Sequence, residues 1–283
     1  MREYYQLAKP GIIYGNLVTA IGGYFLAIHG SVHFGLLLAM SLGLALVIGS
    51  ACVFNNYTDR GIDAKMERTA KRALVSGSIS GPQALVFGAL LGGFGVALLI
   101  LGTNLLTALV ALFGFVMYVG PYGYFKRRSV HGTLVGSLPG AVPPVVGYCA
   151  VTGRIDAAAA ILFLILICWQ MPHFYAIAMY RLSDYVEAGI PVLPAVRGMA
   201  ATKLQILLYV TLFIVAASLL WAFGYAGYVY LAGAVALGLA WLWIGLKNFK
   251  VLNDELWGRG MFRFSLIVIT ALSVLFAVGP HLP

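Results

Sequence analysis

The sequence is poor in charge, since only 10% of its 283 residues are Asp, Glu, Lys or Arg, whereas soluble domains average about 25%. Hydrophobic residues instead make up 61% of the chain. They gather in apolar stretches that are each close to the ~20 residues a helix needs to cross a bilayer. This composition excludes an ordinary soluble protein and predicts an all-α polytopic membrane protein.

Nine such stretches can be placed along the chain, and we expect nine transmembrane helices around a central cavity. They leave no length for a further soluble domain, so residues 1–283 are expected to form a single transmembrane domain. The expected spans are 11–28, 34–57, 83–101, 104–125, 133–151, 157–179, 204–223, 226–246 and 262–278.

Cysteine is also scarce, with three residues in the chain. Cys52, Cys149 and Cys168 each fall inside an apolar span, and none belongs to a CxxC or another metal-ligand spacing. We interpret all three as small buried hydrophobic residues. The sequence therefore offers no cysteine-based metal site.

Negative charge is the scarcer sign, because nine Asp and Glu residues stand against 18 Lys and Arg residues, a formal net charge of +9. The expected spans place 17 of the 18 basic residues in loops on one side and only Arg154 on the other. By the positive-inside rule, the N-terminus and the charged loops face the cytoplasm and the C-terminus faces outside. Topology and contact with anionic membrane lipid account for Arg128, Lys247 and Lys250. Nucleic acid is excluded as a partner, because no soluble basic domain is present to bind it.

Charge is concentrated between Asn55 and Arg72, at the end of the second span. Within this segment Asn55, Asp59, Asp63 and Glu67 recur every four residues, so on a helix their oxygens lie along one slowly drifting stripe. Like charges at this spacing destabilise a plain helix, and a divalent ion removes the conflict. The pattern predicts a metal and diphosphate site. The alternative is a solvated helix end, where these carboxylates, the last of them above all, pair with adjacent cations.

A second acidic loop follows the sixth span, at 180–197, and echoes the first. Asp184 is the expected metal ligand there, and Glu187 could share its face. Two such hairpins that face each other would place two acidic sites across one cavity, as in other membrane proteins built from duplicated halves. Taken alone, this segment is typical of an ordinary loop.

A tyrosine and three cations end the fourth span. Tyr122 and Lys126 lie four residues apart, so both could point into the mouth of a cavity, and Arg127 follows directly. Lysine as a point charge and arginine as a fork both suit phosphate oxygens. The alternative is a cluster that only sets the topology, and it accounts for at least one of the residues 126–128.

Proline and polar residues interrupt the fifth and sixth spans. Three prolines in 139–144 predict a kinked or broken helix. Broken backbone survives at membrane depth only where it is buried in protein or lines a cavity, so we expect this segment to form a cavity wall. Gln170 and His173 are unfavourable in a membrane span without a purpose, which makes them candidates to bind an acceptor substrate.

Several motifs together resemble a known family. Asn-x3-Asp-x3-Asp from Asn55, a second Asp loop four spans later and Arg-Thr-x2-Arg from Arg68 are similar to the UbiA superfamily of intramembrane prenyltransferases. Segments 55–60, 66–69, 126–129, 140–144, 169–173 and 190–194 resemble the branch of this superfamily that attaches farnesyl to haem. The resemblance covers nearly the whole chain. One departure is Ala188, where many superfamily members carry a further Asp.

The resemblance implies a UbiA-type prenyltransferase fold and the transfer of farnesyl from farnesyl diphosphate to a vinyl group of haem B, with water addition, to give haem O. It implies Mg²⁺ as cofactor and a bacterial inner membrane as location, and it makes terminal oxidase assembly or haem-modifying enzymes plausible partners. His173 could face the haem, coordinate its iron or merely hydrogen-bond a neighbouring backbone. Competing hypotheses are an aromatic acceptor, as in quinone biosynthesis, and a polytopic transporter, which the clustering of Asp and Glu at span ends disfavours.

On this hypothesis the polar residues divide by role. The expected metal ligands are Asn55, Asp59, Asp63 and Asp184. The expected diphosphate-binding residues are Arg68, Arg72, Lys126, Arg127 and Tyr122, and the expected acceptor-binding residues are His173 and Gln170. Catalysis is expected from Asp59, Asp63 and Lys126, because metal and cations stabilise the leaving diphosphate as the allylic C–O bond breaks.

Overall fold

The chain folds as a bundle of long helices, seen in a computed structural model that describes residues 1–28, 30–67, 69–247, 249–250 and 253–279. These residues contain helices and no strand. Nine of the helical segments in this part of the chain are long and apolar enough to cross a membrane. The expectation of an all-α, multi-pass membrane protein with nine spans is confirmed.

The first five spans lie between residues 10 and 152, and the fourth and fifth are not continuous α-helices. The fourth contains a π-helical turn, η1, and the fifth is broken at Ala141 between α8 and α9. The segments are α2 (Pro10–Ala27), α3 (Phe34–Asp63), α5 (Gly81–Gly102), α6 (Leu105–Met117), η1 (Tyr118–Tyr122), α7 (Gly123–Phe125), α8 (Gly132–Gly140) and α9 (Val142–Thr152).

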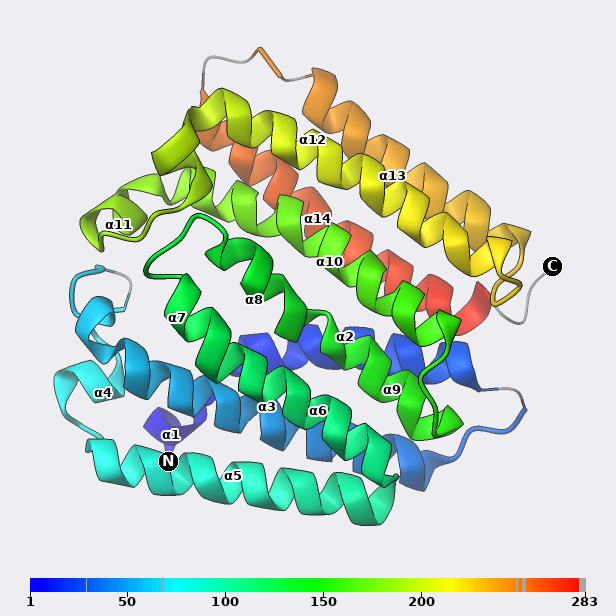
Figure 1. Cartoon of the computed structure of the whole chain (residues 1–283), viewed down its shortest axis with the longest axis horizontal. Helices are drawn as coiled ribbons and strands as arrows, with labels where there is room; N and C mark the ends of the chain where they lie inside the picture. Colours follow the sequence, from blue (N-terminus) through cyan, green and yellow to red (C-terminus); the bar gives the residue numbers. More distant parts are fainter. Residues whose placement is uncertain (29, 68, 248, 251–252, 280–283) are drawn as a thin grey trace.

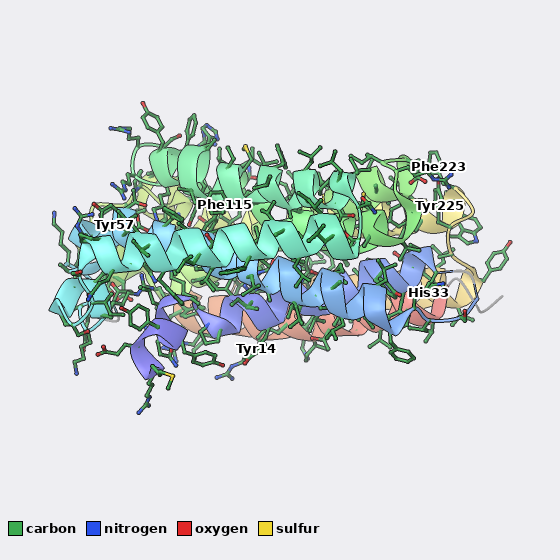
Figure 2. The ribbon with its side chains drawn as sticks, turned by 90° about the horizontal axis from the view of Figure 1, so that it is seen from below. Tyr14, His33, Tyr57, Phe115, Phe223 and Tyr225 are labelled. Carbon is green, nitrogen blue, oxygen red and sulfur yellow. The ribbon has the colours of Figure 1, made fainter. Side chains whose placement is uncertain are left out.

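The remaining four spans are single long helices, and three short helices stand outside the spans. The long helices are α10 (Ala157–Tyr180), α12 (Leu193–Ala222), α13 (Tyr228–Lys247) and α14 (Asp254–Val278). The short ones are α1 (Arg2–Leu7), α4 (Ala73–Ser76) and α11 (Leu182–Glu187), and all three lie at the end of the bundle where α3 finishes (Figure 1). Seen from below, Tyr57 marks that end, whereas His33, Phe223 and Tyr225 lie together at the other (Figure 2).

Polar residues define where several helices begin. Their side chains accept hydrogen bonds from the first free backbone N–H groups, which have no partner inside the helix. Ser80 forms a capping box with Gln83 at the start of α5. The other side-chain caps are Asn104 for α6, Asp156 for α10 and Asn253 for α14.

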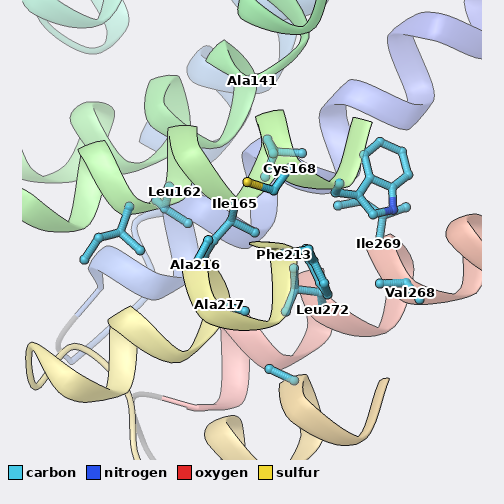
Figure 3. Packing of buried hydrophobic residues seen from close by; sticks show 14 of the residues in the cluster. Ala141, Leu162, Ile165, Cys168, Phe213, Ala216, Ala217, Val268, Ile269 and Leu272 are labelled. Carbon is cyan, nitrogen blue, oxygen red and sulfur yellow. The ribbon is translucent and has the colours of Figure 1, made fainter. Parts of the chain in front are cut away.

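The interior is held by two kinds of contact. Apolar side chains of α10, α12 and α14 interdigitate, among them Ile165, Phe213 and Leu272, which are fully buried (Figure 3). Glycines bring α2 and α9 together, since a Cβ at Gly147 would lie only 1.9 Å from the carbonyl oxygen of Ala20. Small residues at such crossings let helices in a membrane approach closely.

The structure corrects three span boundaries. Helix α3 runs to Asp63, six residues beyond the expected end, and α14 begins at Asp254, eight residues before the expected start. The helical stretch of α12 begins at Leu193 but is interrupted at Gly198, whose φ of +79° is left-handed. Hydropathy shows where the apolar layer ends, whereas the helices continue past it into the charged segments.

Candidate active site

A cavity of about 1250 Å³ lies inside the bundle and collects most of the residues expected to act. Its wall includes the break between α8 and α9, as expected for the proline-rich segment. Arg127 does not line it, although it contacts a residue that does, and Arg68 lies outside the described residues. The expected residues that line the cavity are Asn55, Asp59, Asp63, Arg72, Tyr122, Lys126, Gln170, His173 and Asp184.

The oxygen stripe of α3 occupies the last three turns of that helix. Asn55, Asp59 and Asp63 are 3, 5 and 5% exposed and share one face, as their spacing predicts. Glu67 does not continue the stripe, because α3 ends at Asp63 and the following turns leave Glu67 exposed and away from the cavity. Of the two possibilities that the sequence left open for Glu67, the structure therefore favours the solvated position over membership of the stripe. The chain folds back over the helix end, where the hydroxyl of Thr69 donates to the carbonyl oxygen of Asp63 at 2.8 Å.

Both carboxylates of the stripe are paired with cations. Asp59 accepts from Lys126 and, at 2.7 Å, from Arg127, which follow α7. Burial lowers the pKa of Lys126, and the adjacent Asp59 opposes that shift. Asp63 accepts from Arg72 at 2.6 Å, and the same guanidinium nitrogen donates to Asn56 at 3.1 Å. The stripe thus holds two groups of charge-assisted hydrogen bonds. The cations of one group follow α7, and the cation of the other precedes α4.

The π-helical turn presents two tyrosines to this end of the cavity. Tyr118 and Tyr122 stack with ring centroids 5.4 Å apart, and Lys126 lies 5.2 Å from the Tyr122 ring centroid. Tyr122 and Lys126 both reach the cavity, in agreement with their four-residue spacing. Pro121 lies within the turn and lacks an N–H to continue a regular helix, which is a physical reason for the irregular backbone here.

Asp184 reaches the same cavity from α11, far along the chain from α3. Among the described residues, its ion-pair partner is Arg181, with N and O atoms 3.9 Å apart. Glu187, the other acidic residue of this helix, is exposed and does not line the cavity. Asp184 therefore lines the same cavity as the stripe of α3, whereas Glu187 does not, and the role of Asp184 as a metal ligand stays a prediction.

The expected acceptor residues lie on α10. Gln170 donates one amide hydrogen to the carbonyl oxygen of Ser137 at 3.1 Å and another to that of Leu166 at 3.0 Å. Its side chain fits against Gly140, where a Cβ would lie 1.9 Å from the amide oxygen, so Gln170 joins α10 to the broken helix. The described partner of His173 is the hydroxyl of Ser265, at 2.7 Å from Nδ1, and not a backbone group.

The oxygen donors suit a magnesium ion that arrives together with a polyphosphate. Within the described part of the chain, no three His, Cys, Asp or Glu side chains form a ready-made metal cage. Mg²⁺ rarely uses such cages, because it keeps water ligands and binds through one or two carboxylates plus substrate phosphates. Asp59, Asp63 and the neutral oxygen of Asn55 on one helix face, with Asp184 on the same cavity, supply that donor set.

The sequence model for the UbiA prenyltransferase family matches residues 16–267, nearly the whole chain. The chain belongs to this family. It is a prenyltransferase built into a membrane bundle.

Two bacterial relatives of this UbiA family chain are similar to it over its entire length. The protoheme IX farnesyltransferase of Yersinia enterocolitica is 50% identical, and the alignment covers 100% of this chain and 96% of the relative. That of Photorhabdus laumondii is 49% identical and covers 100% of this chain and 97% of the relative.

Solved structures show the same fold at low sequence identity. A digeranylgeranylglyceryl phosphate synthase superposes with a TM-score of 0.81 at 19% identity and covers 99% of both chains. A UbiA homologue from Archaeoglobus fulgidus, bound to GPP and Mg²⁺, gives a TM-score of 0.70 at 14% identity, over 97% of this chain and 99% of the other. The UbiA-type fold expected from the motifs is confirmed.

Two residues of this UbiA site were missed by the reasoning from sequence. Lys9 donates to the side-chain oxygen of Asn55 at 3.0 Å, and the hydroxyl of Tyr118 lies 3.5 Å from that same oxygen. Lys9 has a left-handed backbone, with φ at 54°, and its withdrawal from water lowers the pKa of the amine to about 8. Tyr118 stands four residues before Tyr122, a signal that could have found it. Lys9 lies just before the first expected span, and nothing near it in the sequence points to Asn55.

Proposed function

We propose that this chain transfers the farnesyl group of farnesyl diphosphate to a vinyl group of haem B, with water addition, and so makes haem O. The observation that carries the proposal is a single cavity in which the α3 stripe and Asp184 meet cations at one end and apolar side chains continue inward. The acceptor is inferred from the two relatives named protoheme IX farnesyltransferase, which match the full length of this chain. Residues 1–283 act as one prenyltransferase domain.

The diphosphate binds where the cations gather. Lys126 and Arg127, which contact Asp59, and Arg72, which contacts Asp63, neutralise its charge. The sequence motif adds Arg68 to this set, although that residue lies outside the described part of the chain. The existing carboxylate partners of the other three support this assignment, because the same hydrogen-bond donors suit phosphate oxygens. Nε of Arg127 adds a further donor, since it is the buried polar side-chain atom without a partner among the described residues. Tyr122 lines the pocket beside Lys126.

Mg²⁺ would be held by Asn55, Asp59, Asp63 and Asp184, and it supplies a Lewis acid that neutralises the departing diphosphate. The cations that move onto the phosphate oxygens free Asp59 and Asp63 for this role. As the allylic C–O bond breaks, both electrons leave with the diphosphate, and Lys126 and its neighbours stabilise the negative charge that develops. Asp59, Asp63 and Lys126 are accordingly the catalytic residues of the proposal.

The apolar part of the cavity holds the farnesyl tail and keeps bulk water from the allylic cation. The vinyl π electrons of haem B attack carbon 1 of the farnesyl group, which leaves a positive charge on the haem side. Water adds there and loses a proton, which completes the hydroxyl of haem O. Gln170 positions the acceptor wall by joining α10 to α8. The apolar lining on the farnesyl side includes Leu44, Val47, Ile48, Ala111 and Phe115.

The proposed location is the bacterial inner membrane, with the N-terminus in the cytoplasm and the C-terminus outside. The distribution of basic residues along the chain supports this orientation. Water-soluble diphosphate then enters at the cytoplasmic end of α3, and the haem product stays in the lipid phase. Proteins that assemble terminal oxidases or modify haem further are the expected recipients of such a product.

The proposal is tested by the mass of the haem formed. Purified protein receives haem B, farnesyl diphosphate and Mg²⁺, and parallel reactions contain 4-hydroxybenzoate in place of haem B or EDTA in place of Mg²⁺. We expect one farnesyl group and one water added to haem B, only with the metal, and equimolar diphosphate released. Transfer to 4-hydroxybenzoate but not to haem B would contradict the proposed acceptor.

A further inference from the structure

Two aromatic side chains on the cavity wall are docked onto a single residue of another helix. Trp169 and His173, one turn apart on α10, stack with ring centroids 4.8 Å apart. The indole N–H of Trp169 donates to the carbonyl oxygen of Ser265 on α14 at 2.9 Å, and Nδ1 of His173 lies 2.7 Å from the hydroxyl of the same residue. Both rings are therefore fixed in direction by Ser265, which is itself fully buried.

The hydrogen bonds around Ser265 assign the tautomer of His173. A serine hydroxyl has one hydrogen, and that of Ser265 is donated to the carbonyl oxygen of Phe262 at 2.6 Å. The oxygen can then only accept from His173, so Nδ1 carries the hydrogen of the neutral imidazole. Nε2 is left with a bare lone pair.

This lone pair is accessible from the cavity. His173 lines the cavity, and Nε2 has no hydrogen-bond partner among the described residues. Nε2 is also not sealed inside the protein. Among the described residues, Nε of Arg127 is the one side-chain nitrogen or oxygen that is both fully buried and without a partner, so Nε2, which has no partner either, must be exposed to the cavity. His173 stands seven residues before the end of α10, which is about 10 Å along the helix at 1.5 Å per residue. A ligand that enters the cavity can therefore bind this nitrogen.

A neutral imidazole with Nδ1–H anchored to an oxygen and Nε2 free is the arrangement that proteins use to bind a transition metal. Haem iron is often held by one such histidine. The surroundings also suit a flat macrocycle, since the cavity lining includes the aromatic rings of Trp169 and Phe174, which contact His173, and the apolar side chains of Ile177, Leu266 and Ile269.

We propose that Nε2 of His173 coordinates the iron of the haem acceptor, and that Ser265 is the positioning residue that fixes the imidazole. The inference rests on the proposed function for the identity of the macrocycle. The nitrogen lone pair forms the bond to iron, and no electron or proton is transferred. One axial bond holds the porphyrin by its centre, so its vinyl-bearing rim is presented to the farnesyl group without a covalent link to the protein.

The test combines a spectroscopic signature with a comparison of two ligands. Ferrous haem B bound to the purified protein is examined by resonance Raman spectroscopy for the iron–histidine stretch. The affinities for haem B and for metal-free protoporphyrin IX are then measured by quenching of tryptophan fluorescence. The variants are His173→Ala, His173→Gln and Ser265→Ala, with His131→Ala as the control, since His131 is exposed and does not line the cavity.

We expect the unaltered chain and His131→Ala to show the iron–histidine band and to bind haem B at least about tenfold more tightly than metal-free protoporphyrin. His173→Ala and His173→Gln lose the band and the preference but bind metal-free protoporphyrin normally, which also shows that they are folded. Added imidazole restores a band in His173→Ala. Ser265→Ala keeps a weakened band and loses about 10- to 100-fold in haem affinity, the usual effect of removing the partner of a ligating histidine.

The possible failures are distinguishable. A band that persists in both His173 variants, or a preference for haem that does not depend on His173, would overturn the iron site even if haem O is formed. A chain that shows the band and the preference but transfers no farnesyl to haem B would contradict the proposed function and leave the iron site standing.

Discussion

Asp59 is the residue on which the positive charge of the site converges. Lys126 and Arg127 both bind it from the turn that follows α7, and the carboxylate is almost fully buried. The two cations favour the ionised form of this carboxylate although it is buried, and together they carry one positive charge more than it neutralises. The excess positive charge is what attracts an anionic headgroup to the cavity.

The role of Asp59 can be tested by comparing its substitution with that of Glu67, an exposed residue that continues the same four-residue spacing. We expect Asp59→Asn to reduce farnesyl transfer by about 10²- to 10³-fold, as when one charge-stabilising group is removed from an active site. Glu67→Gln should leave the rate unchanged, because Glu67 lies past the end of α3 and away from the cavity. The measurement is the initial rate of haem O formation over a range of Mg²⁺ concentrations. Equal losses in the two variants would contradict the arrangement of the stripe.

Lys9 offers a second test at the scale of one side chain. Its amine binds Asn55 at the cavity, so Lys9→Gln removes a cation from the region proposed for the diphosphate. We expect KM for farnesyl diphosphate to rise about tenfold, which corresponds to about 1.4 kcal/mol, with a smaller change in kcat. Lys65→Gln is the control, because Lys65 is exposed in the turn after α3. An unchanged KM in Lys9→Gln would remove Lys9 from the binding site.

At the scale of the helices, the contact between α2 and α9 requires glycine, because a side chain at the crossing would collide with the facing backbone. Gly23 and Gly147 face the partner backbone, where an added Cβ would lie 2.0 Å from the carbonyl oxygen of Pro144 and 1.9 Å from that of Ala20. Neither backbone can move locally, since each belongs to a packed helix. A methyl group at either glycine must therefore push the two helices apart.

We expect Gly147→Ala to lower the free energy of unfolding by about 1–3 kcal/mol, the usual effect of overpacking. Gly93→Ala on α5 should be neutral or stabilising, because no atom lies within 4 Å of its added Cβ and alanine favours the helix. The measurement is the unfolding midpoint of each variant in the same detergent. A Gly147→Ala midpoint equal to that of Gly93→Ala would contradict the close contact.

The helices themselves could be predicted from the sequence, because hydropathy and length alone identify spans in a bilayer. The face of α3 that carries Asn55, Asp59 and Asp63 was also predictable, since helical spacing fixes it. The end of α3 was not, because it depends on Thr69 and Arg72 folding back onto Asp63. A local pattern does not reveal such a return of the chain.

Contacts between distant helices were likewise out of reach. The hydrogen bond from His173 to Ser265 joins residues 92 positions apart, and the sequence around either residue does not predict the other as its partner. The bond from Lys9 to Asn55 spans 46 positions and depends on a left-handed backbone at Lys9. One sequence lists the groups that can bond, whereas only the packed bundle decides which of them meet.

At the scale of the molecule, the two ends of the bundle differ in charge, and the proposed orientation follows from that difference. Single cysteines test it. Ser78 and Arg154 are both exposed, in loops at opposite ends of the chain's spans, whereas the native Cys52, Cys149 and Cys168 are buried. We expect a membrane-impermeant maleimide added to intact cells to label Arg154→Cys but not Ser78→Cys, and both after the membrane is opened. The reverse pattern would contradict the orientation.

The internal ion pairs of the α3 stripe also bear on turnover. When inorganic pyrophosphate leaves, Lys126 and Arg127 can return to Asp59, and Arg72 to Asp63, so the empty mouth never exposes bare charge to a medium of low dielectric constant. The carboxylates of Asp59 and Asp63 thus compete with pyrophosphate for the same lysine and arginine side chains. The same contacts that receive the donor's headgroup therefore help the cycle to restart.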